Sequence, residues 1–473
     1  MPWPHRLTGV VILVAACLLA GALTAPDTPV AANRIDAGLR ALHQGLYGRA
    51  EDLFREAAAA APDEPDPQLF IAFNRWWRLL LEERGRREDD AAFDAAIDAA
   101  IRIGNAHLLR VPGDPRPLAA AGAARILRSH MEALRHNYFR AAQEARRGKK
   151  TLEAALEADP TANAALFALG ALNYFADKVP TLVKGLRVLL FLPGGNAELG
   201  LHQLETVAAS KGPFRTDAQL LLAILRGSRE EGCFSQSIRA LRATLEENPG
   251  SPLILGSIGE IQMRLGEYAP ASSSFEEGLR SAQGDDPDRA RQRRFLRLSL
   301  AESLVADWRL ERGAEILRQA DADPGPMSEA ARRARDRAER DLASKRTSAP
   351  PEPLRLLEAG RRAEAIESLT QSLSHSPDVA SVRFLRGHLL LEAGEVERAL
   401  VDLETADRLS VDPPGWLAGW LEIDLGQIAR QTGRERAARS HFRRASEIRR
   451  FRSDDRGVLE MEVGSEPNPV CGG

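Results

Sequence analysis

Four side chains that could do acid–base chemistry lie in one region of this chain. Tyr138, Tyr174, Lys178 and His202 carry the hydroxyl, ammonium and imidazole groups that a general acid or base needs. If the fold brings them together, region 130–210 forms a ligand-binding or enzymatic cleft. This is one hypothesis for the function.

Motifs that would specify a reaction are absent from the sequence. It contains no Gly-rich phosphate loop, HExxH zinc pattern, GxSxG elbow or paired-cysteine metal spacing. His130 and His136 are six residues apart, which places them on different faces of a helix. His202, His388 and His441 stand alone on predicted helices, where a histidine more often packs than binds a ligand. We therefore predict a protein without catalytic residues, cofactors or metal, that is, not an enzyme.

The elements that position these residues are predicted by a repeat of 34 residues. Gly232, Phe234, Ser237, Leu241 and Pro249 stand one period before Gly266, Tyr268, Ala271, Phe275 and Gln283. This pattern resembles the tetratricopeptide repeat (TPR), a pair of antiparallel helices that buries its apolar face only by stacking on neighbouring pairs. The resemblance predicts an all-α fold, an α-solenoid of antiparallel helix pairs wound into a TPR-like superhelix.

Individual residues of the repeat have physical roles. Gly232 and Gly266 lie where the chain leaves the first helix, and glycine adopts a positive φ there at low cost. Leu241 and Phe275 are predicted to be buried where the two helices cross. Pro249 ends the second helix because proline cannot continue it.

The pattern divides the chain into segments. We predict a signal peptide or anchor at 1–25, a first TPR at 31–64, divergent helical repeats at 65–217, a TPR block at 218–326, a charged helix with a proline-rich linker at 327–353, a C-terminal TPR block at 354–452 and a disordered tail at 453–473. Residues 327–346 alternate arginine with acidic residues and hold almost no large apolar side chain. A helix that is polar all round is typical of a solvent-bridging spacer. The segment is therefore predicted to join two separate blocks.

The middle of the chain, from about Trp76 to Pro249, resembles a family of bacterial envelope proteins with divergent TPRs. The residues that carry the resemblance are Ala171 to Phe175, Leu189 to Gly195 and Gly200 to Leu204. The resemblance implies the fold and the compartment, and it transfers no activity.

The N-terminal residues have the form of a targeting segment. Leu7 to Leu23 is apolar without a charge and follows a short basic start. We expect an exported protein, periplasmic or envelope-associated, with membrane attachment through this segment as an alternative to cleavage. Cys17 ends a lipobox-like Val-Ala-Ala-Cys and could carry a lipid. Of the other cysteines, Cys233 and Cys471 are expected to be free thiols, with a disulfide between them as the alternative.

Composition agrees with a scaffold. The chain has 473 residues, 28% of them charged, and a net charge of -3. A nucleic-acid partner would require a strongly basic domain, so none is predicted. A solenoid suits this length because its stability sums over neighbouring repeats.

Partner-binding residues follow from the TPR resemblance, which implies that fixed offsets of each first helix face the groove. The candidates are Gln219, Arg226, Arg229, Glu260, Met263, Arg264, Phe384, His388, Trp420, Gln427 and Arg430. The lysine and asparagine clamp of chaperone-binding members is absent from these offsets. We therefore predict a non-catalytic protein-protein interaction scaffold, a TPR adaptor of the bacterial cell envelope, whose partners are other proteins or peptides.

Overall fold

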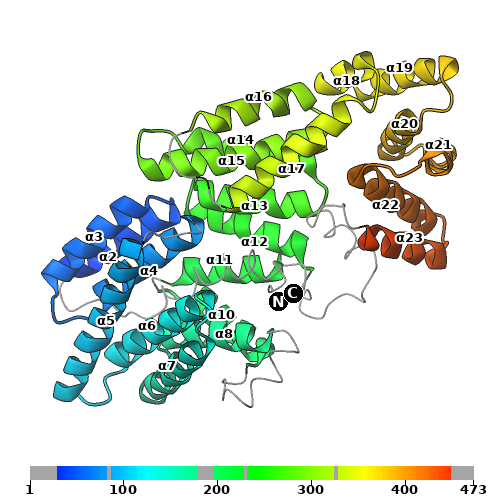
Figure 1. Cartoon of the computed structure of the whole chain (residues 1–473). Coiled ribbons are helices and arrows are strands. Elements are labelled where there is room, and N and C mark those ends of the chain that lie inside the picture. The colour runs from blue at the N-terminus through cyan, green and yellow to red at the C-terminus, as the bar shows by residue number, and fades with distance from the viewer. Residues whose placement is uncertain are drawn as a thin grey trace. The chain divides into compact units, whose positions relative to one another are not determined.

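The structure is a computed structural model that describes residues 29–82, 87–178, 195–212, 214–227, 232–323, 327 and 329–448. Over these residues the chain forms 21 helices and no strand (Figure 1). Consecutive helices pack against one another in pairs. The predicted fold class, all-α with paired helices, is confirmed.

The contacts divide the chain into two compact units. The first unit contains α2 (Pro29–His43), α3 (Tyr47–Ala60), α4 (Asp66–Glu82), α5 (Arg87–Arg110), α6 (Pro115–Leu134), α7 (Tyr138–Ala158), α8 (Asn163–Asp177), α10 (Ala197–Ala209) and α11 (Arg215–Arg226). The division runs through α12 (Phe234–Glu247) and α13 (Pro252–Arg264). The second unit contains α14 (Tyr268–Ser281), α15 (Pro287–Ala306), α16 (Leu310–Asp321), α17 (Glu329–Arg346), α18 (Pro351–Glu358), α19 (Arg362–His375), α20 (Ala380–Glu392), α21 (Val396–Leu409), α22 (Gly415–Gln431) and α23 (Glu435–Glu447).

The turns between paired helices share one conformation. Gly232 and Gly266 have φ of 69° and 74°, so the predicted equivalence of these two turns is confirmed. His136 and Trp308 occupy the same kind of turn with φ of 63° and 64°. After each of these two residues the next backbone N–H bonds back to the preceding helix, at 2.8 Å in both cases. The positive φ costs a residue with a Cβ on the order of 1 kcal/mol, which the packing around it must offset.

A glycine of the first helix lies directly against a large side chain of the second. A Cβ placed on Gly38 would come within 2.4 Å of the Phe54 ring, and a Cβ on Gly426 would meet Phe442 at the same distance. Gly259 stands in the same relation to Phe275. In each pair the aromatic residue follows the glycine by sixteen positions. The spacing shows that one packing arrangement recurs along the chain.

The predicted core positions are buried. Leu241 and Phe275 both have 0% of their surface exposed. The register read from the 34-residue period is therefore confirmed at both helix crossings.

In the first unit, residues late in its sequence contact the first described helix, α2. His43, at the end of α2, bonds through Nε2 to Asp217 Oδ1 of α11 at 2.8 Å. The Ser251 hydroxyl donates to the His43 carbonyl at 2.6 Å, and Phe70 stacks on Phe214 at 6.4 Å. Side chains from the two ends of this unit therefore form one buried contact.

The charged segment 327–353 differs from the predicted spacer. Helix α17 buries Ala331, Ala334, Ala338 and Leu342, so the expectation that it is polar all round is wrong. Alanine methyl groups form its apolar stripe, which a search for large apolar residues misses. Arg337 donates two hydrogen bonds to the Glu302 carboxylate, at 2.8 and 3.0 Å.

The prolines after α17 begin a helix. α18 starts at Pro351, and proline suits the first turn because its missing N–H would be unpaired there. Residues 255–323 and 330–448 belong to one contact unit, so helices before and after α17 lie in the same unit.

The close approach of paired helices gives a stability prediction. Gly259→Ala should lower the free energy of unfolding by about 1 to 3 kcal/mol, because its methyl group would overlap the Phe275 ring. Gly256→Ala is the matched control on the same helix, since the nearest side-chain atom to its Cβ would lie at 3.4 Å. Urea denaturation of both variants measures the difference. Equal midpoints for the two variants would contradict the role of the glycine.

Candidate functional site

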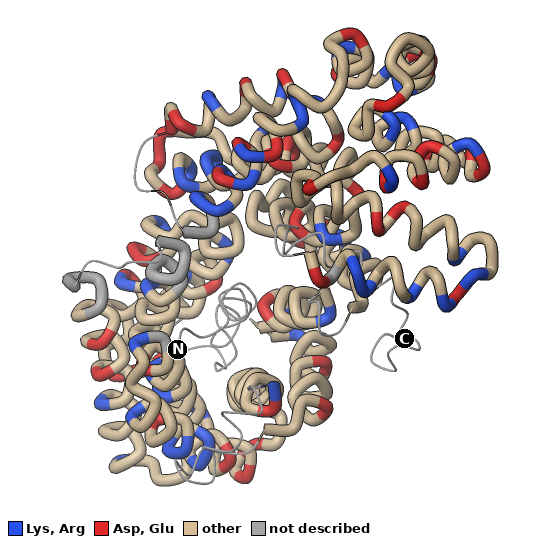
Figure 2. The backbone as a smooth tube through the Cα atoms, turned by 45° about the vertical axis from the view of Figure 1, so that its right-hand side comes forward, with Lys and Arg blue, Asp and Glu red and all other residues tan. Residues whose placement is uncertain are grey.

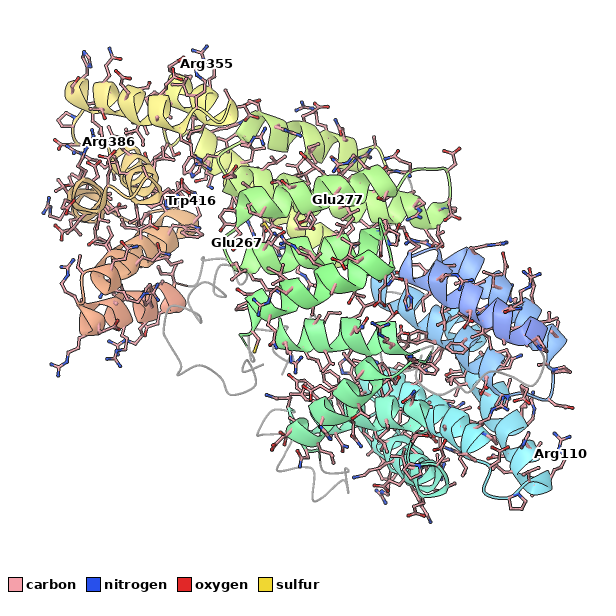
Figure 3. The ribbon with its side chains drawn as sticks, turned by 180° about the vertical axis from the view of Figure 1, so that it is seen from behind. Arg110, Glu267, Glu277, Arg355, Arg386 and Trp416 are labelled. Atoms are coloured by element: carbon pink, nitrogen blue, oxygen red, sulfur yellow. The ribbon has the colours of Figure 1, made fainter. Side chains whose placement is uncertain are left out.

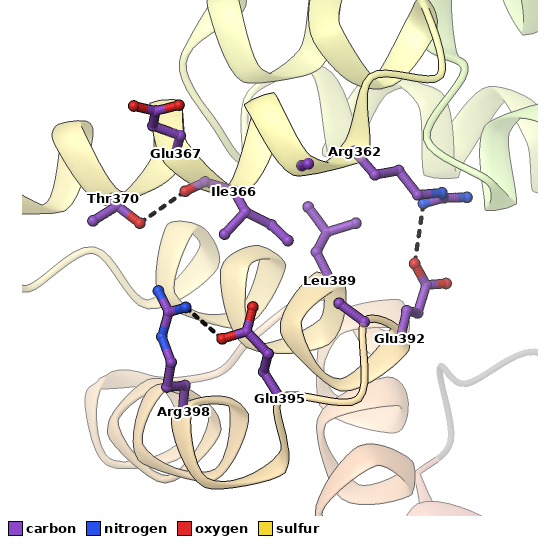
Figure 4. Close-up of a pocket in the computed structure, with 10 residues that line it drawn as sticks. Arg362, Ile366, Glu367, Thr370, Leu389, Glu392, Glu395 and Arg398 are labelled. Carbon is purple, nitrogen blue, oxygen red and sulfur yellow. Dashed lines mark hydrogen bonds and ion pairs between the residues drawn. The ribbon is translucent and has the colours of Figure 1, made fainter.

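A groove in the second unit is formed by α19, α20 and α21 (Figure 4). Its volume is about 490 Å³. Ten residues line it: Arg362, Ala363, Ile366, Glu367, Thr370, Leu389, Glu392, Ala393, Glu395 and Arg398. The groove therefore combines an apolar floor with charged edges.

The floor follows from the way the three helices are built. Ile366 of α19 and Leu389 of α20 point toward one another across the opening in Figure 4. Gly394, with φ of 80°, turns the chain so that α21 runs back beside α20. Leu403 then packs over Gly387, where a Cβ would come within 2.8 Å. This close packing fixes the relative position of α20 and α21.

Two ion pairs stand at the edges of the groove. Arg362 bonds to Glu392 at 3.1 Å, and Arg398 bonds to Glu395. All four side chains are more than a third exposed to solvent, and such pairs contribute only about 0 to 1 kcal/mol. A binding partner could therefore replace either bond with a bond of its own at little cost.

Arg362 also reaches Asp307, which ties α19 to the end of α15. The two side chains bond at 2.5 Å. Burial raises the pKa of the Asp307 carboxyl, and the Arg362 guanidinium partly opposes that rise. The contact holds one edge of the groove in place.

The predicted partner residues of the C-terminal block meet elsewhere, in an aromatic cluster. Phe384 stacks on His388 with ring centres 5.7 Å apart and is only 1% exposed. Trp420 packs edge-on against His388 and also against Tyr268 of α14, with ring centres at 5.8 and 5.9 Å. These candidates thus contact the chain's own side chains.

The two remaining candidates of this block lie further along α22. Gln427 is half-buried. Arg430 is exposed, and its guanidinium lies 5.8 Å from the centre of the Phe442 ring. Neither residue lines the groove of Figure 4.

A buried lysine extends the aromatic cluster. Lys345 donates to the carbonyls of Val305 and Ala306 at 3.0 and 3.1 Å, and its ammonium lies 4.5 Å from the Trp308 ring centre. Trp416, labelled in Figure 3, packs edge-on against Trp308 at 5.5 Å. The sequence did not predict a role for Lys345, because its partners are backbone carbonyls, and a pattern of residue types does not indicate them.

Three candidates from α13 also belong to the second unit. Glu260 accepts a hydrogen bond from Ser299 at 2.9 Å, and Met263 is buried. Arg264 donates to the Gly227 carbonyl at 2.8 Å. Each of these side chains takes part in packing within the unit.

The candidates from the first unit are Gln219 and Arg226. Gln219 is half-buried. Arg226 forms an ion pair with Glu205 of α10. Arg229 lies outside the described residues.

The acid–base residues of region 130–210 have separate surroundings. Tyr138 bonds to His136 at 2.8 Å, and the Lys178 ammonium lies 5.4 Å from the Tyr174 ring centre. His202 is exposed on α10. Residues 179–194, part of the predicted cleft region, lie outside the described residues.

A serine, a histidine and an aspartate do meet in the first unit, but with the wrong geometry for catalysis. Ser251 bonds to the backbone carbonyl of His43, whereas a nucleophilic serine needs the imidazole nitrogen as its base. The Nε2 atom of His43 instead bonds to Asp217. The three residues are buried and join parts of the fold.

Two further findings concern metal and membrane. Within the described residues, no three histidine, cysteine or acidic side chains come together as a metal site requires. None of the described helices has the length and apolar character needed to span a bilayer.

Residues 1–25, with the predicted targeting segment, lie outside the described part of the chain, as do Cys17 and Cys471. Cys233 is buried and disulfide-bonded, so the expectation of a free thiol there is wrong.

Comparison with known proteins agrees with the helix-pair geometry. Residues 356–418 match the family model of the tetratricopeptide repeat, and the groove of Figure 4 lies within these residues. The match covers only this segment, which includes α19 and α20. No curated protein matches it.

Several solved structures are similar to this chain at low identity. The human IFIT1 dimer with m7Gppp-AAAA is 14% identical over 87% of this chain and 96% of the other, with a TM-score of 0.32. Yeast Tom70 is 10% identical over 91% and 94%, with a TM-score of 0.28. A tetratricopeptide repeat protein from Parabacteroides merdae is 16% identical over 72% and 99%, with a TM-score of 0.26. At these TM-scores the likeness supports nothing about ligands or partners.

The histidine of the aromatic cluster should make stability depend on alkaline pH. Burial by itself lowers the pKa of His388, but the Asp424 carboxylate at 2.8 Å outweighs it, and this pKa lies above its ordinary value. Its contribution to stability is therefore complete below about pH 6.5 and is lost as the pH rises through the folded-state pKa. Burial also raises the pKa of Asp424, so ionisation of this carboxyl likewise lowers stability as the pH rises.

Urea denaturation measures this loss of stability. The pH is varied from about 6.5, the ordinary pKa of histidine, to about 9. His388→Gln should reduce the loss of stability that wild type shows as the pH rises. His375→Gln, at an exposed position, should lose stability as wild type does. Identical pH profiles for wild type and His388→Gln would contradict the role of this pair.

His130 should have the opposite effect in the first unit. Burial lowers its pKa to about 4, and its Nδ1 accepts a hydrogen bond from Trp76 at 3.2 Å. The neutral imidazole stabilises the fold above about pH 6.5, and the benefit, at most about 3 kcal/mol, is lost as the pH falls toward the folded-state value. His130→Gln should flatten the acid limb of a stability-against-pH curve, and the exposed His202→Gln should not.

Proposed function

We propose that this chain is a non-catalytic protein-protein interaction scaffold of the bacterial cell envelope. The tetratricopeptide repeats support the coarser part, since stacked helix pairs of this kind present extended surfaces for binding. The envelope location rests on the apolar N-terminal segment and on the sequence resemblance of the middle region. On this proposal the protein is exported and has no reaction of its own.

The observation that carries the proposal is the groove of α19, α20 and α21. Ile366 and Leu389 offer an apolar floor, and the edges offer charges of both signs. An extended or helical peptide binds such a surface by placing one apolar side chain in the opening and charged residues beside it. The groove suits a protein segment of that pattern.

The aromatic cluster does not compete for this role. Phe384 and Trp420 contact the chain's own side chains and so contribute to the fold of the block. The cleft hypothesis for region 130–210 is less well supported, because Tyr138 and Lys178 each bond within their own neighbourhood.

Affinity capture from detergent-solubilised envelope, with the native N-terminal segment retained, tests the proposal. Ile366→Glu places a charge on the groove floor and should reduce recovery of the captured protein at least tenfold, as loss of a central contact does. Arg398→Glu changes only the exposed edge and should give a smaller loss.

Val411→Asp is the control, because Val411 is 91% exposed and lies outside the groove. Circular dichroism of each variant checks that the helices are retained. Recovery that is the same for Ile366→Glu and Val411→Asp would exclude the groove as the binding site. Capture of no protein by wild type would contradict the scaffold itself.

A further inference from the structure

The last helix of the described chain, α23, has one strongly basic face. Arg436, Arg439 and Arg443 follow one another at spacings of three and four residues, so they lie along one side of the helix. All three are exposed. The opposite side carries Ala438 and Ala445, which are buried with Phe442 in one apolar cluster with α22. We call the three arginines the arginine face.

The charge around this face is unusual for the chain. Among the described residues, 430–448 contain six arginines, at 430, 434, 436, 439, 443 and 444, and two glutamates, at 435 and 447. The whole chain has a net charge of -3, and basic and acidic residues are interspersed along most of its tube in Figure 2. Arginine thus outnumbers acidic residues over α23 and the end of α22.

Arg444 of α23 is turned toward the neighbouring helix α22. Arg444 donates to Glu422 of α22 at 2.7 Å, and the carboxylate also bonds to His441 at 2.8 Å. These bonds and the attraction of Arg444 lower the pKa of Glu422 against the effect of its burial. The Glu422 charge is therefore used within the helix pair, on a different side from the arginine face.

The charge and exposure of the arginine face favour a broad anionic partner. An amphipathic peptide instead needs an apolar groove for its side chains. The groove of this unit lies on α19, α20 and α21, whereas the arginine face stands on the outer side of the terminal helix. A guanidinium group can donate two parallel hydrogen bonds to the oxygens of one phosphate. Each basic side chain near an anionic lipid surface also adds to the affinity for that surface.

We propose that the arginine face binds the headgroup phosphates of a membrane that contains anionic phospholipid. Binding is electrostatic, because the exposed large apolar residues of the described chain do not include any from α23. The surface is distinct from the groove, so this proposal can fail while the scaffold function holds, and the reverse is also true.

Cosedimentation of the purified full chain with lipid vesicles tests the proposal. One set of vesicles is pure phosphatidylcholine and the other contains phosphatidylglycerol as well. The first set measures any binding by the N-terminal apolar segment alone. The arginine face predicts tighter binding to the second set, and this excess should fall as salt is raised.

The decisive variant removes the three positive charges of the arginine face. The triple variant Arg436→Gln, Arg439→Gln and Arg443→Gln should bind phosphatidylglycerol vesicles on the order of a hundredfold more weakly than wild type. The control triple variant Arg355→Gln, Arg361→Gln and Arg408→Gln loses the same charge at exposed positions elsewhere and should bind nearly as wild type. Thermal melting followed by circular dichroism shows whether both variants are folded.

Several results would overturn the proposal. They are equal binding to both kinds of vesicle, equal binding by wild type and the triple variant, and equal losses for the two triple variants. Displacement by inorganic phosphate at constant ionic strength would assign the face to free phosphate instead. Binding of a polyglutamate peptide without vesicle binding would assign it to an acidic protein.

Discussion

The close approach of two helices within each pair is the constraint on which the rest of the structure depends. Gly38, Gly259 and Gly426 leave room for an aromatic ring of the following helix, and no other residue type would fit at that distance. The ring is thereby buried inside the pair, and the outer faces of both helices are left to contact neighbouring pairs. Because the arrangement recurs, stacking can continue through both units, although the sequences of the pairs differ greatly.

Contacts distant in sequence then decide which surfaces remain open. In the first unit, the His43 and Asp217 side chains join its beginning to α11. In the second unit, Lys345 and Trp416 bring α17 and α22 against the turn at Trp308. These contacts occupy side chains that could otherwise have faced a partner. The groove and the arginine face are the surfaces of the second unit on which the two functional proposals rest.

Part of the candidate site was accessible from the sequence. The helices around the groove follow from the repeat register, and Gly360 and Gly394 mark its turns with φ of 72° and 80°. The groove itself was not predicted, because the TPR resemblance directed attention to Phe384, His388 and Trp420 on the first helices. Those residues meet Tyr268 and Asp424, which lie in other repeats, and a pattern local to one repeat does not contain that information.

The sequence by itself determined the helix pairs, their turns and their buried positions, because these depend on residues within one 34-residue period. It misjudged α17, since three alanines and one leucine form a buried stripe on this helix. Tertiary structure alone decided the positive φ of Trp308, the burial of Lys345 and the position of the groove. Each of these depends on contacts between helices far apart in the chain, where the free energy of burial outweighs the local preference of the residue.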